Sequence, residues 1–306
     1  MIFEKFISLD KGQKVAYLYY LYVVMSLPFF LGLFTLLNFE FPMQNAVEIF
    51  LYSAFFGVCV LAWKKHPPGW WVMLHFTIAF LIVSYAEIES VYILEHYFYH
   101  GWIIRYFGYS LTIGLGWVCI SYSIYLLTNV LVMGRENWKG FSPGHHYFES
   151  KHRFQQIFFI FLLALIDGLI FFHIGVVNET LGIELGFWSY VPRVEPKFIG
   201  LTPTFTLYSY FAAGLFFGFL FRFYEYLTNE FGKRKTKSLE KYDGLPLIPF
   251  FEYWLFLYLS AIWKFGIHHW VIFVSSPILV LLIVGTIRSY FNFSRVDKEK
   301  NLLITD

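Results

Sequence analysis

The stretch FIFLLALIDGLIFFHIG, residues 159–175, decides the class of fold. Apart from Asp167 and His173, it holds only apolar residues and glycine. An α-helix needs about 20 apolar residues to cross the hydrocarbon core of a bilayer. The stretch and its apolar flanks therefore predict a transmembrane helix that carries one carboxyl group inside it.

The composition of the whole chain agrees with this prediction. Of its 306 residues, 58% are hydrophobic, 24% are aromatic and only 14% are charged, whereas soluble domains carry about 25% charged residues. The net charge of +2 does not favour nucleic-acid binding. The two cysteines form no CxxC pair, so the sequence predicts neither a disulfide framework nor a thiolate metal site.

Apolar runs of spanning length recur along the chain. They predict an all-α fold, one polytopic transmembrane helical bundle that covers residues 1–306. We expect eight helices, or seven if one of the shorter runs is re-entrant. The predicted spans are 15–37, 47–63, 70–87, 107–133, 154–176, 203–224, 247–264 and 268–288.

The positions of Lys and Arg predict the orientation. With this map, nineteen of the 23 basic residues fall on the side of the N-terminus, Arg222 among them, and four fall on the other side. Cytoplasmic loops carry an excess of Lys and Arg. We therefore expect both termini in the cytoplasm and a multi-pass protein of a prokaryotic cytoplasmic membrane. Two long segments, 86–106 and 177–202, lie on the opposite side, and we expect them to pack over the helix ends.

Asp167 needs a physical reason, because an ionisable residue inside a span is costly and is a functional candidate by default. A carboxyl group kept neutral by an apolar site can donate a proton to a weak base. The alternative is a hydrogen bond that packs this helix against a neighbour. His173 lies six residues further, on roughly the same face, as its hydrogen-bond partner or as an interface histidine.

The segment SYAEIESVYILEHYFYHG, residues 84–101, breaks the apolar pattern with acids and histidines. Helical spacing would align Glu89, His96 and His100, and a His-x-x-x-His pair can chelate a metal from one helical face. Membrane desaturases use further HxxHH boxes, which this chain lacks. We therefore favour a site without metal, with one ion at His96 and His100 as the alternative.

Two blocks follow each other in a characteristic order. Residues 86–124 place Ala-Glu at a helix end, then an aromatic-Gly-Tyr segment and G-x-G-W. Residues 163–214 place the intramembrane Asp before G-x-W-x-Y and the turn FIGLTPTF. Over about residues 84–215 the chain thus resembles the bacterial and archaeal carotenoid 1,2-hydratases, a family of membrane carotenoid-biosynthesis proteins. It departs from that family in having IGLG before the Trp, Asn178-Glu179 for an acid-Pro pair, and TPTF for Pro-x-Asn-Phe.

The resemblance implies acid-catalysed addition of water to a terminal double bond of an acyclic carotenoid. Protonating an alkene requires a positioned acid, and the cation that forms is stabilised by aromatic faces, each worth about 0.5–2 kcal/mol. The candidate catalytic acids and bases are Asp167 and Glu87, with Glu179 and Glu89 secondary. The candidate substrate-binding residues are Trp117, Tyr122, Trp188, Tyr190 and His173. We expect a lipophilic isoprenoid substrate, no cofactor, and an oligomeric state that the sequence leaves open.

There are two alternatives, and the first of them uses the same residues. If water is excluded, an internal double bond captures the cation, and the enzyme is a terpene or carotenoid cyclase. A transporter or lipid-binding membrane protein would instead use Asp167 and Glu252 as a proton relay. Few of the predicted spans are broken by Gly or Pro, as transporter helices often are, so we favour an enzyme.

Overall fold

The computed structural model describes most of the middle of the chain. The described residues are 43–65, 69–102, 104–133, 152–191, 197–199, 202–231 and 275–285, with isolated positions between 255 and 273. They are mostly helical, which confirms the predicted all-α class. The chain forms two compact units, residues 1–119 (unit 1) and residues 120–306 (unit 2), which divide within one long helix.

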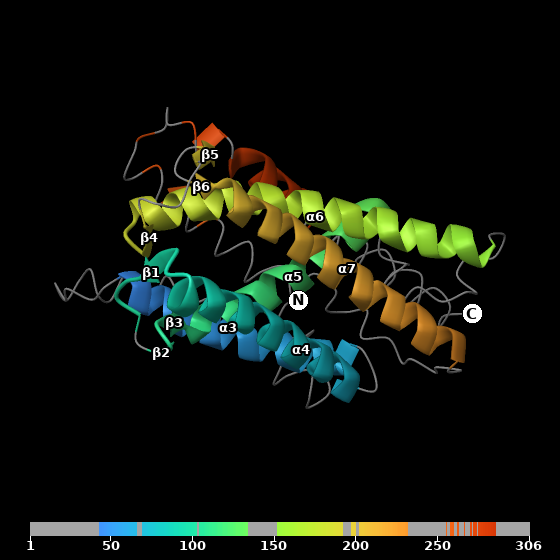
Figure 1. The fold of residues 1–306 in the computed structure, drawn as a ribbon. Coiled ribbons are helices and arrows are strands. Elements are labelled where there is room, and N and C mark those ends of the chain that lie inside the picture. The colour runs from blue at the N-terminus through green and yellow to red at the C-terminus, as the bar shows by residue number, and fades with distance from the viewer. Residues whose placement is uncertain are drawn as a thin grey trace, which may run out of the picture. The chain divides into compact units, whose positions relative to one another are not determined.

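Unit 1 is built from apolar helices and an aromatic loop, residues 94–102 and 104–110, which leads from η1 to α5. Figure 1 shows the order of these elements along the chain. Its elements are α3 (Met43–Lys65), α4 (Gly69–Ile88), one π-helical turn η1 (Glu89–Ile93), β1 (Tyr97–Tyr99), β2 (Arg105–Tyr106), β3 (Tyr109–Ser110) and the start of α5 (Leu111–Met133). Strands β2 and β3 pair antiparallel, and Phe107 and Gly108 between them both have positive φ. Two such residues make the tight turn that a right-twisted hairpin prefers. The span predicted from residue 107 therefore begins four residues later, at Leu111.

Unit 2 contains the rest of α5 and a similar succession of elements. These are α6 (Arg153–Glu184), β4 (Trp188–Tyr190), β5 (Lys197–Ile199), β6 (Thr202–Pro203) and α7 (Thr204–Phe231). Strands β5 and β6 pair antiparallel, with Ile199 opposite Thr202.

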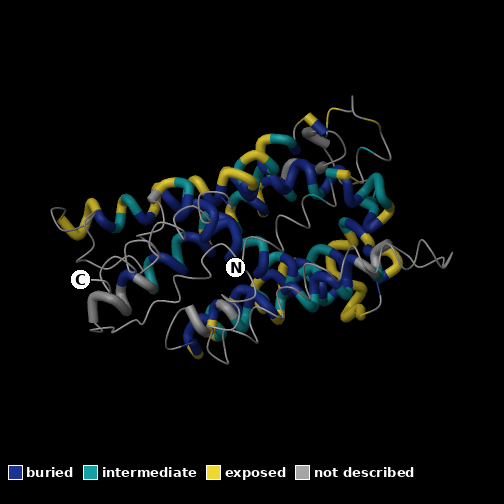
Figure 2. Tube along the Cα trace, turned by 180° about the vertical axis from the view of Figure 1, so that it is seen from behind, coloured by how far each residue is buried: buried dark blue, intermediate teal, exposed yellow. Residues whose placement is uncertain are grey.

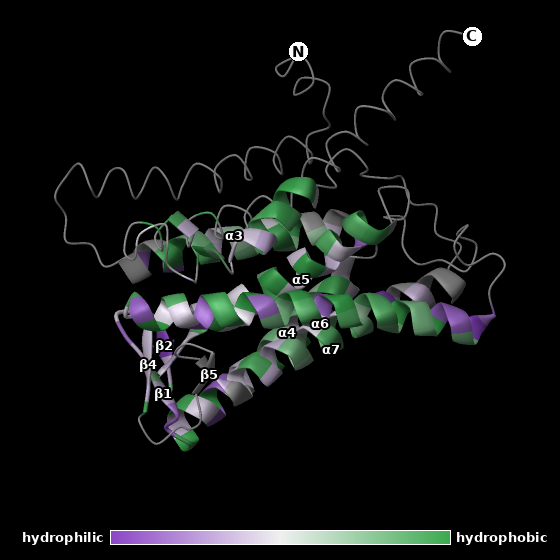
Figure 3. Ribbon diagram, turned by 90° about the horizontal axis from the view of Figure 1, so that it is seen from above, coloured by the Kyte–Doolittle hydropathy of each residue, from purple (hydrophilic) through white to green (hydrophobic). Residues whose placement is uncertain are grey.

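Helix α6 is longer than the sequence predicts. Its 32 residues span about 48 Å at 1.5 Å per residue, well beyond the hydrocarbon core of about 30 Å. The predicted end at residue 176 is wrong by eight residues, because hydropathy falls there while the helix continues to Glu184. Figure 3 shows the result, with hydrophilic colour at both ends of α6 and hydrophobic colour along most of its length.

Small residues let α6 and α7 approach closely, and the two helices run side by side in Figure 1. On α7, Gly214 and Gly218 form a GxxxG pair, a pattern that brings membrane helices into backbone contact. A Cβ added to Gly214 would lie 2.9 Å from the backbone oxygen of Asp167. A Cβ on Gly218 would meet the Asp167 carboxylate. Neither position has room for a side chain.

In the part of the chain that the structure describes, four helices are long and apolar enough to cross a membrane, namely Gly69–Ile93, Leu111–Val132, Arg153–Glu184 and Thr206–Tyr224. Val47–Val60 and Ser275–Gly285 are shorter apolar helices. The predicted span 15–37 and most of 247–264 lie outside the described residues, so the count of eight, the single domain and the position of the termini stay predictions. Exposed apolar side chains recur along α4 at Leu74, Ile78 and Leu81, as a lipid-facing helix requires, and Figure 2 shows such exposed positions alternating with buried ones.

Candidate functional site

The end of α4 holds a buried carboxyl group, that of Glu87, which is 8% exposed. Two phenol hydroxyls donate hydrogen bonds to it, from Tyr97 at 2.5 Å and from Tyr99 at 2.7 Å. Both bonds end on the same oxygen, Oε2. Within the described part of the chain, the other oxygen, Oε1, accepts no hydrogen bond, and no cation pairs with Glu87.

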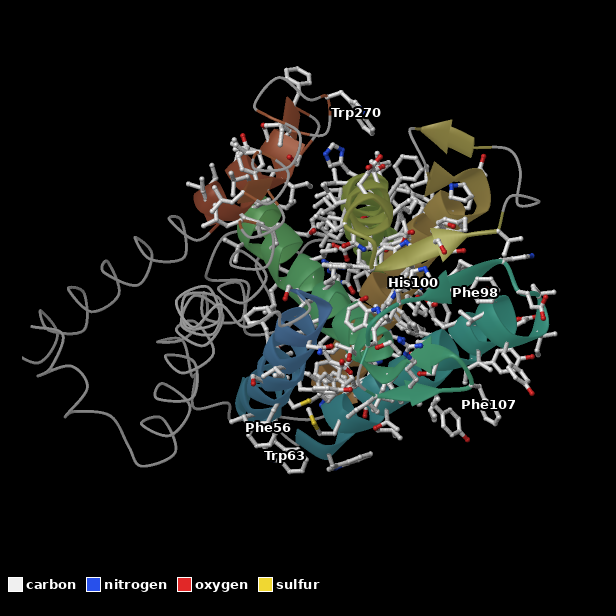
Figure 4. The ribbon with its side chains drawn as sticks, turned by 90° about the vertical axis from the view of Figure 1, so that its left-hand side faces the viewer. Phe56, Trp63, Phe98, His100, Phe107 and Trp270 are labelled. Carbon is white, nitrogen blue, oxygen red and sulfur yellow. The ribbon has the colours of Figure 1, made fainter. Side chains whose placement is uncertain are left out.

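The local sequence explains how the two tyrosines reach Glu87. Helix α4 ends in the π-helical turn η1, and Glu95 has a positive φ of 49°, so the chain reverses before β1. Successive side chains of a strand point to opposite faces. In the Tyr-Phe-Tyr sequence of β1, Tyr97 and Tyr99 are therefore buried on one face, and Phe98, labelled in Figure 4, is exposed on the other.

More aromatic groups surround this site and hold its tyrosines. The ring of Tyr99 meets the rings of Trp102 and Tyr109 edge to face, with centroids 6.5 and 6.4 Å apart. The hydroxyl of Tyr109 shares a hydrogen bond of 3.1 Å with that of Ser84 on α4. Burial raises the pKa of Tyr109, so this phenol stays protonated.

A second carboxyl group of unit 1, that of Glu48 on α3, ties the aromatic loop to the helices. It is fully buried, and its Oε1 accepts bonds from the backbone N–H of Ile104 at 3.1 Å and the hydroxyl of Thr112 at 3.1 Å. Tyr52, one turn along α3, donates a third bond of 3.2 Å. The sequence reasoning missed Glu48, although an acid four residues before a Tyr inside an apolar run was a usable signal.

In unit 2, Glu179 near the end of α6 is the centre of a similar cluster. It is 7% exposed, and three side chains donate to it. The indole N–H of Trp188 lies 2.9 Å and the hydroxyl of Tyr190 2.7 Å from Oε2. The hydroxyl of Tyr210 on α7 lies 2.8 Å from Oε1, and it accepts a bond of 2.9 Å from the side-chain amide of Asn178.

Two glycines on α6 make room for these donors. Gly175, Glu179 and Gly182 are four and three residues apart, so they share one face of the helix. A Cβ on Gly175 would lie 2.6 Å from the ring of Tyr210, and one on Gly182 would lie 2.1 Å from the ring of Trp188. The two rings thus rest directly on the helix backbone, on either side of Glu179.

The two units share this design. In each, a long apolar helix ends near a buried Glu, a short strand returns with aromatic donors, a two-stranded hairpin follows, and another apolar helix begins. The donors follow Glu87 by 10 and 12 residues and Glu179 by 9 and 11 residues. The sequence reasoning did not detect this repeat, because the two copies share few residues besides Glu and the aromatic pair.

Asp167 lies elsewhere on α6 and has a different partner. It is 1% exposed and forms a two-oxygen ion pair with Arg222 of α7, which is fully buried. Arg222 also donates to Asn129 Oδ1 at 3.0 Å and to the carbonyls of Gly218 at 3.1 Å and Tyr125 at 3.3 Å. All five of its N–H donors are therefore used, and α5, α6 and α7 are tied together at this point.

This arrangement changes two sequence interpretations. Arg222 was counted with the cytoplasmic basic residues, and that is wrong, because its side chain is buried against Asp167.

Asp167 and Glu179 are twelve residues apart on one helix, about 18 Å along its axis. They do not form one site, and the catalytic role of Asp167 stays a prediction.

The metal alternative assumed that residues 89–100 are one helix, and that assumption is wrong. His96 and His100 flank the strand β1, and His100 is labelled in Figure 4. Glu89 is half-buried at the start of the π-helical turn η1. Because a strand intervenes, the spacing that would align these three side chains on one helical face is lost. Among the residues that the structure describes, no three His, Cys, Asp or Glu side chains gather in a group that could hold a metal ion.

Of the two predicted aromatic pairs, one contacts a single carboxyl group, and the members of the other point in different directions. Trp188 and Tyr190 both donate to Glu179. Trp117 and Tyr122 are five residues apart on α5 and so about 140° apart around it, and they do not share a face. Tyr122 instead stacks on Tyr125, with centroids 6.0 Å apart. The remaining candidate, His173, is half-buried on α6. Six residues beyond Asp167, it lies about 120° from Asp167 around the helix, so the expectation that the two share a face is wrong.

No protein-family model matches the chain, and comparisons with curated proteins and with solved structures gave no match. The geometry of the two carboxyl clusters is therefore the basis for a proposed function.

Proposed function

We propose that the protein is a membrane enzyme of isoprenoid metabolism that protonates a carbon–carbon double bond with the carboxyl group of Glu87. The favoured outcome is hydration of the terminal double bond of an acyclic carotenoid. The observation that supports it best is the position of the Glu87 carboxyl, which is buried at a helix end, bonded on one oxygen only and surrounded by aromatic rings.

The surroundings of Glu87 suit a proton donor. A charged carboxylate buried in apolar surroundings is costly unless a cation compensates it. Among the described residues none does, so the neutral acid is favoured. Tyr97 and Tyr99 donate to Oε2, which leaves the proton on Oε1, the oxygen that no described residue contacts by a hydrogen bond. The two tyrosines also hold the carboxyl in one orientation, as general acid catalysis requires.

Asp167 is less suited to this role. An arginine side chain stays protonated at all ordinary pH values, and its two bonds to Asp167 favour the ionised carboxylate. An ionised carboxylate has no proton to give to an alkene. We therefore assign proton donation to Glu87 and leave Asp167 the task of joining α6 to α7.

The proposed reaction conserves its atoms. The Oε1–H bond of Glu87 breaks as a new C–H bond forms at the inner carbon of the terminal double bond, and the outer carbon, which carries two methyl groups, becomes a tertiary cation. The rings of Tyr97, Tyr99 and Trp102 supply the aromatic faces that stabilise such a cation. Water then adds to the cation and loses a proton to the Glu87 carboxylate, so the product gains one H₂O and the enzyme is restored.

The cyclase alternative shares the first step. An internal double bond attacks the cation in place of water, which closes a ring and leaves a new cation. A carbon next to the new cation then loses a proton to the Glu87 carboxylate, and a double bond forms there. The product is then an isomer of the substrate. The two outcomes differ only in whether water reaches the cation, and product mass separates them.

Proton-coupled transport is the candidate from another class. A relay through Asp167 would require this carboxyl to take up and release a proton in each cycle. Its ion pair with Arg222 opposes protonation, and Glu252, the other proposed member of the relay, lies outside the described residues. The geometry therefore supports the enzyme better than the transporter.

The test is expression in cells that accumulate lycopene or an acyclic C50 carotenoid, followed by mass analysis of the pigments. We expect a product heavier by one water, absent with Glu87→Gln and present with Glu89→Gln, a nearby half-buried carboxyl without the tyrosine bonds. An isomer of unchanged mass would identify the cyclase. An unchanged pigment profile across several acyclic substrates would reject both reactions.

A further inference from the structure

The clusters around Glu87 and Glu179 differ in how the donors are distributed. Glu87 accepts two hydrogen bonds, both on Oε2. Glu179 accepts two on Oε2 and a third, from Tyr210, on Oε1. A neutral carboxyl must keep its proton on one oxygen, whereas a carboxylate can accept on both. A carboxylate that accepts such bonds on both of its oxygens is favoured over its acid, because a proton on either oxygen would displace a donor.

Tyr210 is held so that it donates to Glu179. The side-chain amide of Asn178 donates to the Tyr210 hydroxyl, which leaves the phenol proton free to point at Glu179 Oε1. The ring is fixed on the backbone of α6 at Gly175. The third donor is therefore a positioned feature of unit 2, and we find no equivalent of it among the described contacts of Glu87.

We propose that unit 2 holds a second, diverged copy of the unit 1 carboxyl site, in which Glu179 is a permanent carboxylate that binds the cationic group of an apolar ligand. The ligand class rests on the proposed function, because a carbocation of an isoprenoid chain is such a group. The charge of Glu179 and the rings of Trp188 and Tyr190 supply the attraction, since cations bind over aromatic faces.

The first test observes the proton directly by infrared spectroscopy. A neutral carboxyl group shows a C=O stretch that shifts in D₂O, and a carboxylate does not. The proposed function predicts such a band from the neutral carboxyl group of Glu87 in the wild-type protein. We expect Glu179→Gln to leave this wild-type band unchanged. Tyr210→Phe keeps the ring against α6 but removes the third donor, so Glu179 should gain a proton and a new band should appear. That band should be absent from the Tyr210→Phe, Glu179→Gln double variant.

The control is Tyr208→Phe on the same helix, since Tyr208 is 67% exposed and should add no band. A wild-type band that disappears in Glu179→Gln would overturn the proposal, and so would a Tyr210→Phe spectrum without a new band. Whether the wild-type band is lost in Glu87→Gln tests only the proposed function, because that band is assigned to Glu87 and not to Glu179. The two ideas can therefore fail separately.

The second test measures binding of a stable mimic of the cation. The probe is a trialkylammonium compound with an isoprenoid tail, compared with its neutral carbon analogue. We expect Glu179→Gln to weaken binding of the ammonium probe about tenfold or more and to leave the neutral analogue unchanged. Glu184→Gln, at the end of the same helix, should affect neither. Equal losses for both probes, or no loss for the ammonium probe, would reject the cation site.

Discussion

Removing Asp167 should destabilise the fold rather than simply stop a reaction. In Asp167→Leu, Arg222 loses the acceptor of two of its five hydrogen bonds and its only carboxylate partner among the described contacts. Its side chain is fully buried, so water does not replace them. Breaking a buried ion pair by removing one partner costs about 3–5 kcal/mol, and we expect a loss of that size in the free energy of unfolding.

A double-mutant cycle tests the reasoning. Replacing both members by apolar residues, Asp167→Leu with Arg222→Met, removes the unpaired charge, and such replacements are often neutral or stabilising. The double variant should therefore recover most of the stability that Asp167→Leu loses. The measurement is unfolding of detergent-solubilised protein in an SDS titration, followed by circular dichroism. A loss below about 1 kcal/mol for Asp167→Leu, or no recovery in the double variant, would show that the pair does not hold these helices.

Other contacts lead to further predictions. Gly182→Leu would place a side chain where the ring of Trp188 lies, 2.1 Å from the new Cβ, so tryptophan fluorescence should shift towards that of an exposed indole. An unshifted spectrum would mean that the ring does not rest on α6. Glu48→Ala leaves the backbone N–H of Ile104 without its acceptor and should lower stability by about 1–3 kcal/mol; an SDS unfolding titration checks this, and an unchanged midpoint would count against it. Phe98, 46% exposed, should lie at the membrane interface, where aromatic residues gather, so Trp at this position should be quenched by brominated lipids, and lack of quenching would place the loop in water.

The helices were the part of the fold that the sequence predicted well. Apolar runs of spanning length follow directly from the need to satisfy the backbone in a bilayer, and α4, α5, α6 and α7 all lie where such runs do. The residues at which the helices end were less predictable. The last turns of α6 are polar, and hydropathy cannot distinguish a helix that projects into water from a loop.

The candidate site was predicted in part. Glu87 and Glu179 were identified as acids at the rim of predicted spans, and Trp188 and Tyr190 were identified through the resemblance, which includes their G-x-W-x-Y segment. The strand Tyr97–Tyr99 was missed, because the spacing of Glu89, His96 and His100 around it was interpreted as helical. Arg222 was misplaced, because a basic residue near the end of an apolar run has the same pattern whether it reaches the cytoplasm or pairs with an acid inside the bundle.

The central claim is that Glu87 delivers the proton, and isotope transfer tests it most directly. In D₂O its carboxyl proton is replaced by deuterium, so each turnover should leave one non-exchangeable deuterium on the carbon that is protonated. We predict that mark in the product of the wild-type protein and of Glu89→Gln, and its loss, together with the product, in Glu87→Gln that is folded and inserted in the membrane. A Glu87→Gln protein that incorporates deuterium at the wild-type rate would contradict the account.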